Sequence, residues 1–474
     1  MRHWSSFFHA SAFLAISACT PLTPDYKRPT DATINRPEVQ GAFASNIGDT
    51  VTTSPPIDQW WLLYRNTELT NLVEKALSVN TDVRVAIANL ARANAGLDVA
   101  RDAQMPQLGL QAAPAYGRNS AEEKLTKGPL SNQRTYSISA SVSYQVDLFG
   151  QVSRSIESAA ARSDAARAAV AATRMTVAAQ TAQSFISACT SGRELSVAQR
   201  AIDIQSQATR LAERQHSDGR VSSLDVTRST TQEEQLRAIL PGLEARRQEA
   251  LYRLAVLTGL PPTDFPRNLA HCVQEPSLAA PIPTGDGRTL LARRPDVARA
   301  EAELHAATAD LGVATADLYP RISLGVSGGS VGLMNNFLSD DTYKFSIGPL
   351  ISWQFPNRGR AKAQVEGAQA SIDAAYARFD GTVLAALQEV EIALNAYRRD
   401  IERLAPLMAA NQSAAKASND TRRLYSEGRE GFLSVLDADR SLLAIEQNVA
   451  AQQTVIASDQ IQLFLALGGG WRAP

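Results

Sequence analysis

The chain has 474 residues, of which 44% are hydrophobic, 6% aromatic and 20% charged. This composition provides enough apolar side chains for a folded core but too few for a polytopic helical membrane protein. The 47 Lys and Arg residues nearly balance the 48 Asp and Glu residues, so no broad basic field exists to hold nucleic acid. Three cysteines, without a CxxC or Cys/His cluster, neither staple the fold nor predict a metal site.

Residues 1–18 are expected to be an export signal peptide. An apolar run from Trp4 to Ala15 follows a positively charged start and is too short to span a bilayer as a permanent helix. It leads into Ile16-Ser17-Ala18-Cys19, which resembles the bacterial lipobox and makes Cys19 the expected acylated N-terminus. An ordinary signal peptide with an incidental cysteine is the alternative. Residues 19–56, rich in Pro, Thr, Asp and Asn, are expected to form a lipidated extended arm.

The remainder of the chain is internally duplicated. Three pairs of matching positions mark the two halves: Asp82 and Asp296, which are 214 residues apart, and Gly150 with Gly359 and Gly219 with Gly428, each 209 residues apart. Each half is expected to contain a helix, an intervening segment, a very long helix, a glycine turn and a returning helix. The two halves differ by five residues within the intervening segment, where a surface loop is expected.

Two stretches of about 66 residues, from Gln151 to His216 and from Arg360 to Tyr425, are dominated by Ala, Arg, Gln and Glu. Each is expected to form one helix without a proline break. At about 1.5 Å per residue, each helix would be roughly 100 Å long. Their many alanines indicate close packing of helices at heptad-like spacing. A rod-like coiled coil is the alternative, and the segments between the helices argue against it.

Four segments have the period of two that is typical of strands between lipid and water. They are Gln107 to Gly117, Tyr136 to Val146, Arg321 to Val331 and Tyr343 to Phe355. In the second segment, Ile138 and Val142 alternate with serines, and we expect the apolar residues to face lipid. The aromatic residues expected in girdles at the membrane surfaces are Tyr136, Tyr144, Tyr343 and Trp353.

Four strands cannot close a barrel, and open sheet edges are not tolerated in lipid. The strands therefore predict an oligomer. Two chains would give eight strands and three would give twelve, and only the larger barrel leaves a lumen of useful width. A soluble sheet of two hairpins is the alternative.

Several motifs together carry a resemblance to a known family. They are Pro24-Asp25-Tyr26-Lys27-Arg28-Pro29, Trp60-Trp61, Leu291 to Val297 followed by Ala300-Glu301, Leu318-Tyr319-Pro320, Glu389 to Leu394, and Val435 to Arg440. With the lipobox, they resemble the TolC/OprM-type outer-membrane efflux family in its lipoprotein branch. The resemblance implies a membrane α+β fold, in which a trimeric 12-stranded β-barrel, with four strands per chain, is continued by a 12-helix periplasmic α-barrel and each chain is internally duplicated.

The chain divides accordingly into ten segments. They are a signal peptide (1–18), a lipidated arm (19–56), first-repeat helices and collar (57–106), β-barrel hairpin 1 (107–148), long helical hairpin 1 (149–258), an equatorial linker (259–286), the second-repeat helix (287–320), β-barrel hairpin 2 (321–355), long helical hairpin 2 (356–467) and a C-terminal tail (468–474).

The resemblance also implies a periplasmic gate. Carboxylates near the helix turns of this family face the pore, which points to Asp225 and Asp437. Arg228 is the repeat equivalent of Asp437, 209 residues before it, which suggests that the two alternate around a closed tip. Ser434 stands where the family often has a second acid, so a doubled acidic ring is in doubt. Two solvated helix-surface charges are the alternative.

The chain is expected to be an exit duct in the outer membrane and is not expected to be an enzyme. The chain has no HExxH, P-loop or Rossmann motif, so no catalytic residue, metal or cofactor is expected. By resemblance, the partners are outer-membrane lipid, an inner-membrane efflux pump and a periplasmic adaptor docked at the turns of Gly219 and Gly428. A duct for type I protein secretion and an envelope coiled-coil scaffold are the alternatives. Thr20 after Cys19 implies sorting to the outer membrane.

The sequence does not determine whether the remaining two cysteines form a disulfide. Cys189 and Cys272 could pair in the oxidising periplasm or stay as buried thiols.

Overall fold

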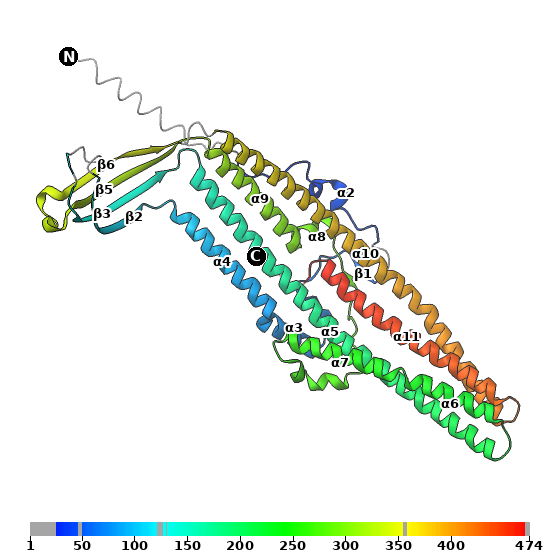
Figure 1. Cartoon of the computed structure of the whole chain (residues 1–474). Coiled ribbons are helices and arrows are strands. Elements are labelled where there is room, and N and C mark those ends of the chain that lie inside the picture. The colour runs from blue at the N-terminus through cyan, green and yellow to red at the C-terminus, as the bar shows by residue number, and fades with distance from the viewer. Residues whose placement is uncertain (1–24, 46–49, 121–126, 129, 354–357, 470–474) are drawn as a thin grey trace. The chain divides into compact units, whose positions relative to one another are not determined.

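The computed structural model describes residues 25–45, 50–120, 127–128, 130–353 and 358–469 (Figure 1). The expected acylation site Cys19 and the end of the fourth strand segment at Phe355 lie outside these residues. The chain forms two compact units. The first is Met1–Pro29, Asn89–Ala166 and Arg299–Phe379, and the second is Thr30–Ala88, Arg167–Ala298 and Asp380–Pro474.

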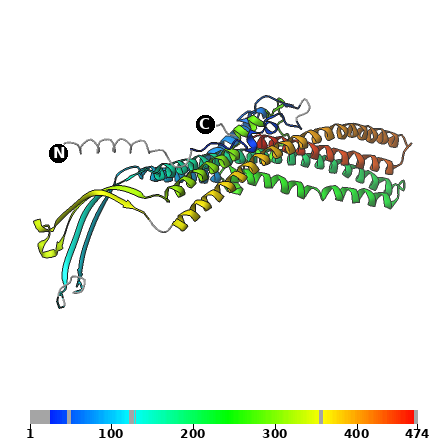
Figure 2. The ribbon, with the colours of Figure 1, turned by 90° about the horizontal axis from the view of Figure 1, so that it is seen from above.

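An antiparallel sheet dominates the first unit. Its strands are β2 (Gln107–Gly117), β3 (Gln133–Val146), β5 (Arg321–Leu333) and β6 (Tyr343–Ser352). They follow the order β2-β3-β5-β6, so that the two hairpins of the duplicated chain join through their inner strands. Figure 2 shows the sheet as a curved ribbon of two such hairpins. In one chain, β2 and β6 are edge strands whose outer backbone groups have no strand partner within the sheet.

The strand register gathers the apolar residues on one face. Val142 lies opposite Leu108 on β2 and Val326 on β5, and Val326 in turn lies opposite Ile347 on β6. Because residues directly opposite in an antiparallel sheet share a face, these four side chains form one apolar row. On the other face, Ser141 lies opposite Gly109 and Ser327. The alternation predicted from the sequence is confirmed on all four strands, and we call the face of Val142 the apolar face.

Tyr136 departs from the expectation of an aromatic girdle. Tyr144, Tyr343 and Trp353 are exposed, but Tyr136 is only 3% exposed. Its ring lies against Phe337, with 4.7 Å between ring centroids, and its hydroxyl lies 2.7 Å from that of Ser330. The position near a strand end was predicted correctly, but the hydroxyl is used to bind the β5–β6 loop instead of meeting the membrane surface.

Helix ends flank the sheet in the first unit. They belong to α4 (Thr81–Asp102), α5 (Gln151–Ser217), α9 (Pro295–Ala316) and α10 (Arg358–Ser426). The start of the arm packs against α9, one of these helices. The ring of Tyr26 stacks on His305 of α9 with 4.4 Å between centroids, and Arg28 forms two 2.7 Å hydrogen bonds with Glu301. These contacts hold the start of the arm against α9 within the first unit.

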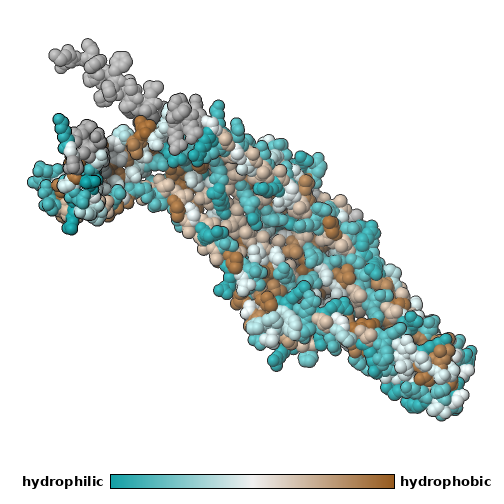
Figure 3. Space-filling view, in the orientation of Figure 1, coloured by the Kyte–Doolittle hydropathy of each residue, from teal (hydrophilic) through white to brown (hydrophobic). Residues whose placement is uncertain are grey.

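Long helices dominate the second unit. Besides most of α5 and α10, it contains α3 (Thr67–Val79), α6 (Ser223–Arg237), α7 (Leu240–Leu257), α8 (Gly287–Arg293) and α11 (Phe432–Ala466). The helices α5, α6, α10 and α11 run side by side in both views (Figures 1 and 2). Short elements connect them: α2 (Pro37–Gln40), 3-10 turns, and β1 (Val51–Thr52), which pairs in parallel with β4 (Ile282–Pro283). On the face seen in Figure 3, apolar side chains are interspersed among polar ones along these helices.

The two long helices have 67 and 69 residues, close to the expected lengths. The expectation that neither contains proline is wrong, because Pro406 lies inside α10. The helix continues through it, although proline removes one backbone hydrogen bond. The first returning arm is also not one helix: α6 ends near Ala238 and α7 restarts with Pro241 in its first turn. No helix within the described ranges has both the length and the apolarity needed to cross a membrane.

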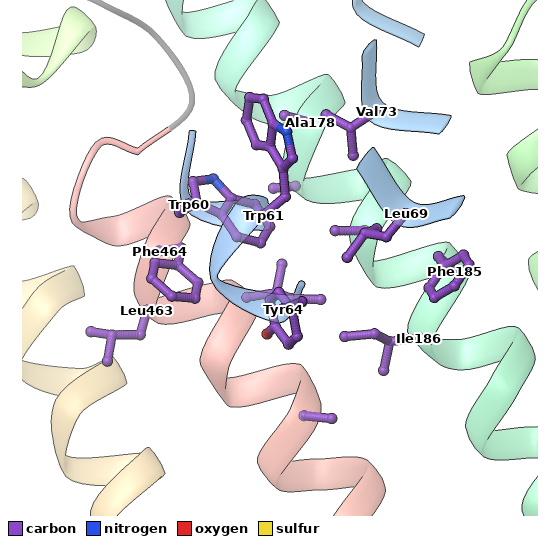
Figure 4. Packing of buried hydrophobic residues seen from close by; sticks show 14 of the residues in the cluster. Trp60, Trp61, Tyr64, Leu69, Val73, Ala178, Phe185, Ile186, Leu463 and Phe464 are labelled. Carbon is purple, nitrogen blue, oxygen red and sulfur yellow. The ribbon is translucent and has the colours of Figure 1, made fainter. Parts of the chain in front are cut away.

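The core of the second unit forms around the Trp60-Trp61 pair (Figure 4). Both indoles are essentially buried, and Trp60 stacks on Phe464 of α11 with 4.8 Å between centroids. Tyr64 is buried beside them, and its hydroxyl donates to Gln460 at 3.2 Å. The pair therefore packs helices of both repeats together.

A disulfide resolves the question that the sequence left open. Cys189 of α5 and Cys272 are bonded, which closes a loop of 83 residues. In the chain-entropy model, closing a loop of this length stabilises the fold by about 4.5 kcal/mol. Gly192, one turn further along α5, allows the close approach, because an added Cβ would lie 2.0 Å from the carbonyl oxygen of Cys272. The equatorial linker is thus fixed to the first long helix.

The arm continues along α10 in the second unit. The carboxylate of Asp380 accepts a hydrogen bond from the backbone N–H of Thr33 at 2.9 Å. Eleven residues further along α10, the carboxylate of Glu391 accepts from the N–H groups of Ala44 and Ser45 at 2.7 and 3.0 Å. Since eleven residues are about three helical turns, both acids lie on one side of α10. They satisfy backbone donors of a segment that has little secondary structure of its own.

A carboxyl pair lies between α10 and α11. Asp400 accepts a hydrogen bond from Gln452 at 2.8 Å and shares a hydrogen bond with Asp459. Burial, followed by the hydrogen bond and the negative charge of Asp400, raises the pKa of Asp459 to about 7. The folded chain therefore keeps a proton on this pair below about pH 7, whereas an unfolded Asp releases it near pH 4.

We expect the pair to make the fold less stable as the pH rises between about pH 4 and pH 7. In that window the folded chain binds more protons than the unfolded chain, so raising the pH lowers the free energy of unfolding. Asp459→Asn keeps a hydrogen-bonding group and removes this titration. Thermal unfolding at about pH 5 and pH 8 checks it, with Asp420→Asn, a half-buried acid paired with Arg423, as the control. An equal fall in Tm for the wild type and Asp459→Asn would contradict the shared proton.

Candidate functional site

The two helical hairpins end in turns of the same geometry. Gly219 and Gly428 adopt φ values of +72° and +71°, in the left-handed region that glycine enters without strain. After each glycine, a backbone N–H closes a bond to the preceding helix, from Arg220 to the carbonyl of Gln215 at 2.8 Å and from Arg429 to that of Leu424 at 2.9 Å. These are Schellman turns. The glycines 209 residues apart therefore mark one structural repeat, at the tip of the second unit.

Asp225 lies at the start of α6, immediately after the first turn. Its carboxylate accepts hydrogen bonds from the backbone N–H and the hydroxyl of Ser222, at 3.2 and 2.9 Å. The Ser222 hydroxyl in turn accepts from the N–H of Asp225, which completes a capping box. Arg228, one turn later, lies 3.8 Å from the Asp225 carboxylate. The sequence predicted a pore-facing acid here, and within one chain this acid caps a helix.

Asp437 lies on α11, on the other arm of the tip, and is exposed. Within the part of the chain that the structure describes, no ion pair joins it to Arg228. One chain thus pairs Arg228 with Asp225 and leaves the carboxylate of Asp437 facing outward. The predicted alternation of Arg228 and Asp437 requires a neighbouring chain.

Sequence reasoning missed a buried acid beside this site. Asp439, two residues after Asp437, is 3% exposed and accepts a hydrogen bond from Ser418 at 2.6 Å. Arg422, one turn after Ser418, binds the same carboxylate with an N–O distance of 2.9 Å. This ion pair fastens α10 to α11 near the tip. A buried acid beside an exposed one on the same helix can be recognised only once the packed face of that helix is known.

The first hairpin has a neutral contact at the matching level. Thr209, the repeat equivalent of Ser418, lies 3.0 Å from the hydroxyl of Ser229, and Gln205 donates to the same hydroxyl at 3.0 Å. All three side chains are buried. At this level, among the described residues, buried polar groups therefore fasten both hairpins, and the charged pair belongs to the second.

One hydrogen bond joins the two hairpins at their ends. The hydroxyl of Tyr425, at the end of α10, donates to Gln215, at the end of α5, at 2.5 Å. Phe432 packs near the Tyr425 ring, with 5.8 Å between centroids. A single hydrogen bond of this kind contributes only about 0.5–1.5 kcal/mol, so the link is weak enough for a binding partner to break.

Among the described residues, no group of three His, Cys, Asp or Glu side chains is arranged to hold a metal.

Sequence comparisons match both repeats of the chain. A family model described as outer membrane efflux protein matches residues 72–260 and 287–469, which is more than half of the chain. The pyoverdine export outer membrane protein OpmQ of Pseudomonas putida is 30% identical over 431 residues, covering 88% of this chain and 89% of that protein. Nodulation protein T of Rhizobium leguminosarum bv. viciae is 28% identical over 461 residues, covering 97% and 92%.

Solved structures of outer-membrane proteins also resemble the chain over most of its length. The outer-membrane channel OprN superposes with a TM-score of 0.88 at 30% identity and covers 95% of this chain and 99% of that one. The outer membrane protein VceC of Vibrio cholerae superposes with a TM-score of 0.79, covering 88% of this chain and all of that one. Since its identity is 24%, that likeness supports the fold alone.

Proposed function

Because the chain belongs to the outer membrane efflux protein family, we propose that it is the exit duct of a tripartite efflux system. It is an outer-membrane efflux channel with a large periplasmic part. In the proposed system, an inner-membrane pump and a periplasmic adaptor deliver drugs or other small toxic compounds, which the duct passes to the exterior. The family match over both repeats carries this proposal. The relative named for pyoverdine export favours small molecules over proteins as cargo.

The proposed assembly is a homotrimer with a 12-stranded barrel. Each chain contributes four strands, and β2 and β6 are exposed along their whole length. In a membrane, the backbone groups of these edges need partners, which further copies of the chain supply. Three copies would also place six helical hairpins, two from each chain, around a common axis as a 12-helix barrel. The equal geometry of the two tip turns supports this near-sixfold packing.

The proposed gate lies at the helical tip. In the trimer, the exposed carboxylate of Asp437 would face Arg228 of a neighbouring repeat, and Asp225 would add negative charge close by. Each exposed ion pair contributes only about 0–1 kcal/mol, but threefold repetition multiplies this modest contribution. The turns at Gly219 and Gly428 are the proposed docking points for the adaptor, since they are exposed ends of the helical hairpins.

We expect lipid on Cys19. The arm contacts the first unit from Tyr26 onward, so a lipidated Cys19 only a few residues earlier can reach a membrane at the helix end of the sheet. Mass spectrometry of the mature N-terminus should find an acylated Cys19, and Cys19→Ala should impair anchoring without preventing barrel insertion, because the strands have their own lipid-facing surface. An unmodified N-terminus at another residue would refute lipidation and leave the channel proposal standing.

For the gate, we expect Asp437→Ala to raise single-channel conductance in planar bilayers and to lower selectivity for cations. Removing a negative ring weakens both the closure and the attraction of cations at the narrowest point. The double change Asp437→Ala with Arg228→Ala should raise conductance further. Asp203→Ala, an exposed acid four turns from the tip on α5, is the control. If both gate variants match the wild type in conductance and selectivity, these residues are solvated charges and the constriction lies elsewhere.

A further inference from the structure

The β5–β6 loop, Met334–Thr342, is folded against the end of the sheet. The hydroxyl of Tyr136 on β3 accepts a hydrogen bond from the backbone N–H of Leu338 at 2.7 Å. The same hydroxyl lies 3.1 Å from that of Thr342, which itself lies 2.7 Å from the hydroxyl of Ser330. Tyr136, Ser330 and Thr342 are all buried. A buried polar cluster of this kind is favourable only when its members are paired, so it fixes the loop in one position.

Two further features fix the position of the loop against the sheet. Leu338 adopts a φ of +57°, a conformation that a leucine holds only when its surroundings impose it. Gly332 lies beneath the loop, where an added Cβ would come within 2.8 Å of the Thr342 side chain. Glycine is therefore needed on β5 for the loop to approach the sheet.

The loop lies over the apolar face. Tyr136 shares that face with Ile138 and Val142, two and six residues further along β3, because side chains alternate along a strand. The loop covers this face at the strand end and exposes apolar side chains of its own. These are Met334, Phe337 and Leu338, which are 38%, 50% and 44% exposed. They continue the exposed row of Tyr343 and Phe345 on β6.

We propose that this loop is a lipid-binding surface at the outer rim of the barrel, with Tyr136 as the residue that positions it. The loop lies at the strand ends opposite the helices, which places it on the exterior side of an outer-membrane channel whose helices are periplasmic. Lipid is the occupant because the loop adds Met334, Phe337 and Leu338 to the apolar face, next to the exposed polar side chains of Asp340 and Asp341. Apolar and aromatic side chains beside polar ones are typical of the boundary between acyl chains and headgroups. The proposal rests on the lipid-facing assignment of that face in the proposed barrel.

The experiment uses single cysteines labelled with an environment-sensitive fluorophore in the full-length protein, reconstituted into phosphatidylcholine vesicles. The disulfide protects Cys189 and Cys272, and the unsubstituted protein gives the labelling background. Probes replace Met334 on the loop, Phe345 on the apolar face and Ser141 on the polar face. Quenching by spin-labelled lipid is compared with quenching by aqueous iodide. We expect lipid to quench the probes at 334 and 345, with 334 responding most to a shallow spin label, and iodide to quench the probe at 141.

Tyr136→Phe tests the positioning role. This change removes only the hydroxyl and keeps the ring against Phe337. We expect loss of lipid quenching at 334, with that at 345 unchanged, because the loop is released while the strands stay in place. If iodide rather than lipid quenches 334 while lipid quenches 345, the loop proposal is overturned and the barrel stands. If lipid fails to quench 345, the barrel assignment itself fails. Unchanged lipid quenching at 334 in Tyr136→Phe would refute the role of Tyr136.

Discussion

Every backbone N–H and C=O group that lies in lipid must be paired within protein, and a sheet of four strands leaves two edges unpaired. In this chain, β2 and β6 are those edges, and both are fully exposed. Exposing the apolar face to water is unfavourable, and leaving the backbone groups of the two edges unpaired in lipid is also unfavourable. Assembly of several copies in a membrane would cover the apolar face with lipid and pair the edges. The internal duplication fits the proposed trimer, since each half would supply one β-hairpin and one helical hairpin to its nearly symmetric ring.

The helical tip combines strong contacts inside each hairpin with weak contacts between hairpins. Inside the second hairpin, the buried Asp439 is bound by Ser418 and Arg422, and the first has a neutral equivalent around Ser229. Between the described ends of the hairpins, Tyr425 donates a hydrogen bond to Gln215, and an apolar cluster of Leu443 with Ala201, Ile202 and Leu236 lies further from the turns. This difference favours movement of whole hairpins past one another over separation of their helices. The proposed gate would open by such movement without unfolding of its hairpins.

The sequence predicted elements whose signal is local and periodic. Alternation along β3 identified the strand and its apolar face, and the glycines at 219 and 428 identified both tip turns. Pro406 is present in the sequence within the stretch that was expected to lack proline, and α10 continues through it because tertiary packing overrides a local helix breaker. The pairing of Cys189 with Cys272, 83 residues away, is a tertiary fact that composition cannot reveal.

For the candidate site, the sequence identified charged residues but not their partners. Asp225 was expected to face a pore. Within one chain its carboxylate is hydrogen-bonded to Ser222 in a capping box. The spacing of three residues between Ser222 and Asp225 could have indicated this local interaction. Arg228 pairs with Asp225 because residues three apart are neighbours on a helix. Tyr136 was placed by its strand position alone, and the loop that uses its hydroxyl is remote in sequence.

The most direct test of the account is the number of chains in the detergent-solubilised complex, measured by native mass spectrometry. The account predicts a single species of three chains, each of the mature mass derived from the 51.0 kDa chain. Twelve strands then close one barrel and leave no unpaired edge. A single chain, or a complex of two, that inserts into vesicles and forms ion-conducting pores would contradict it.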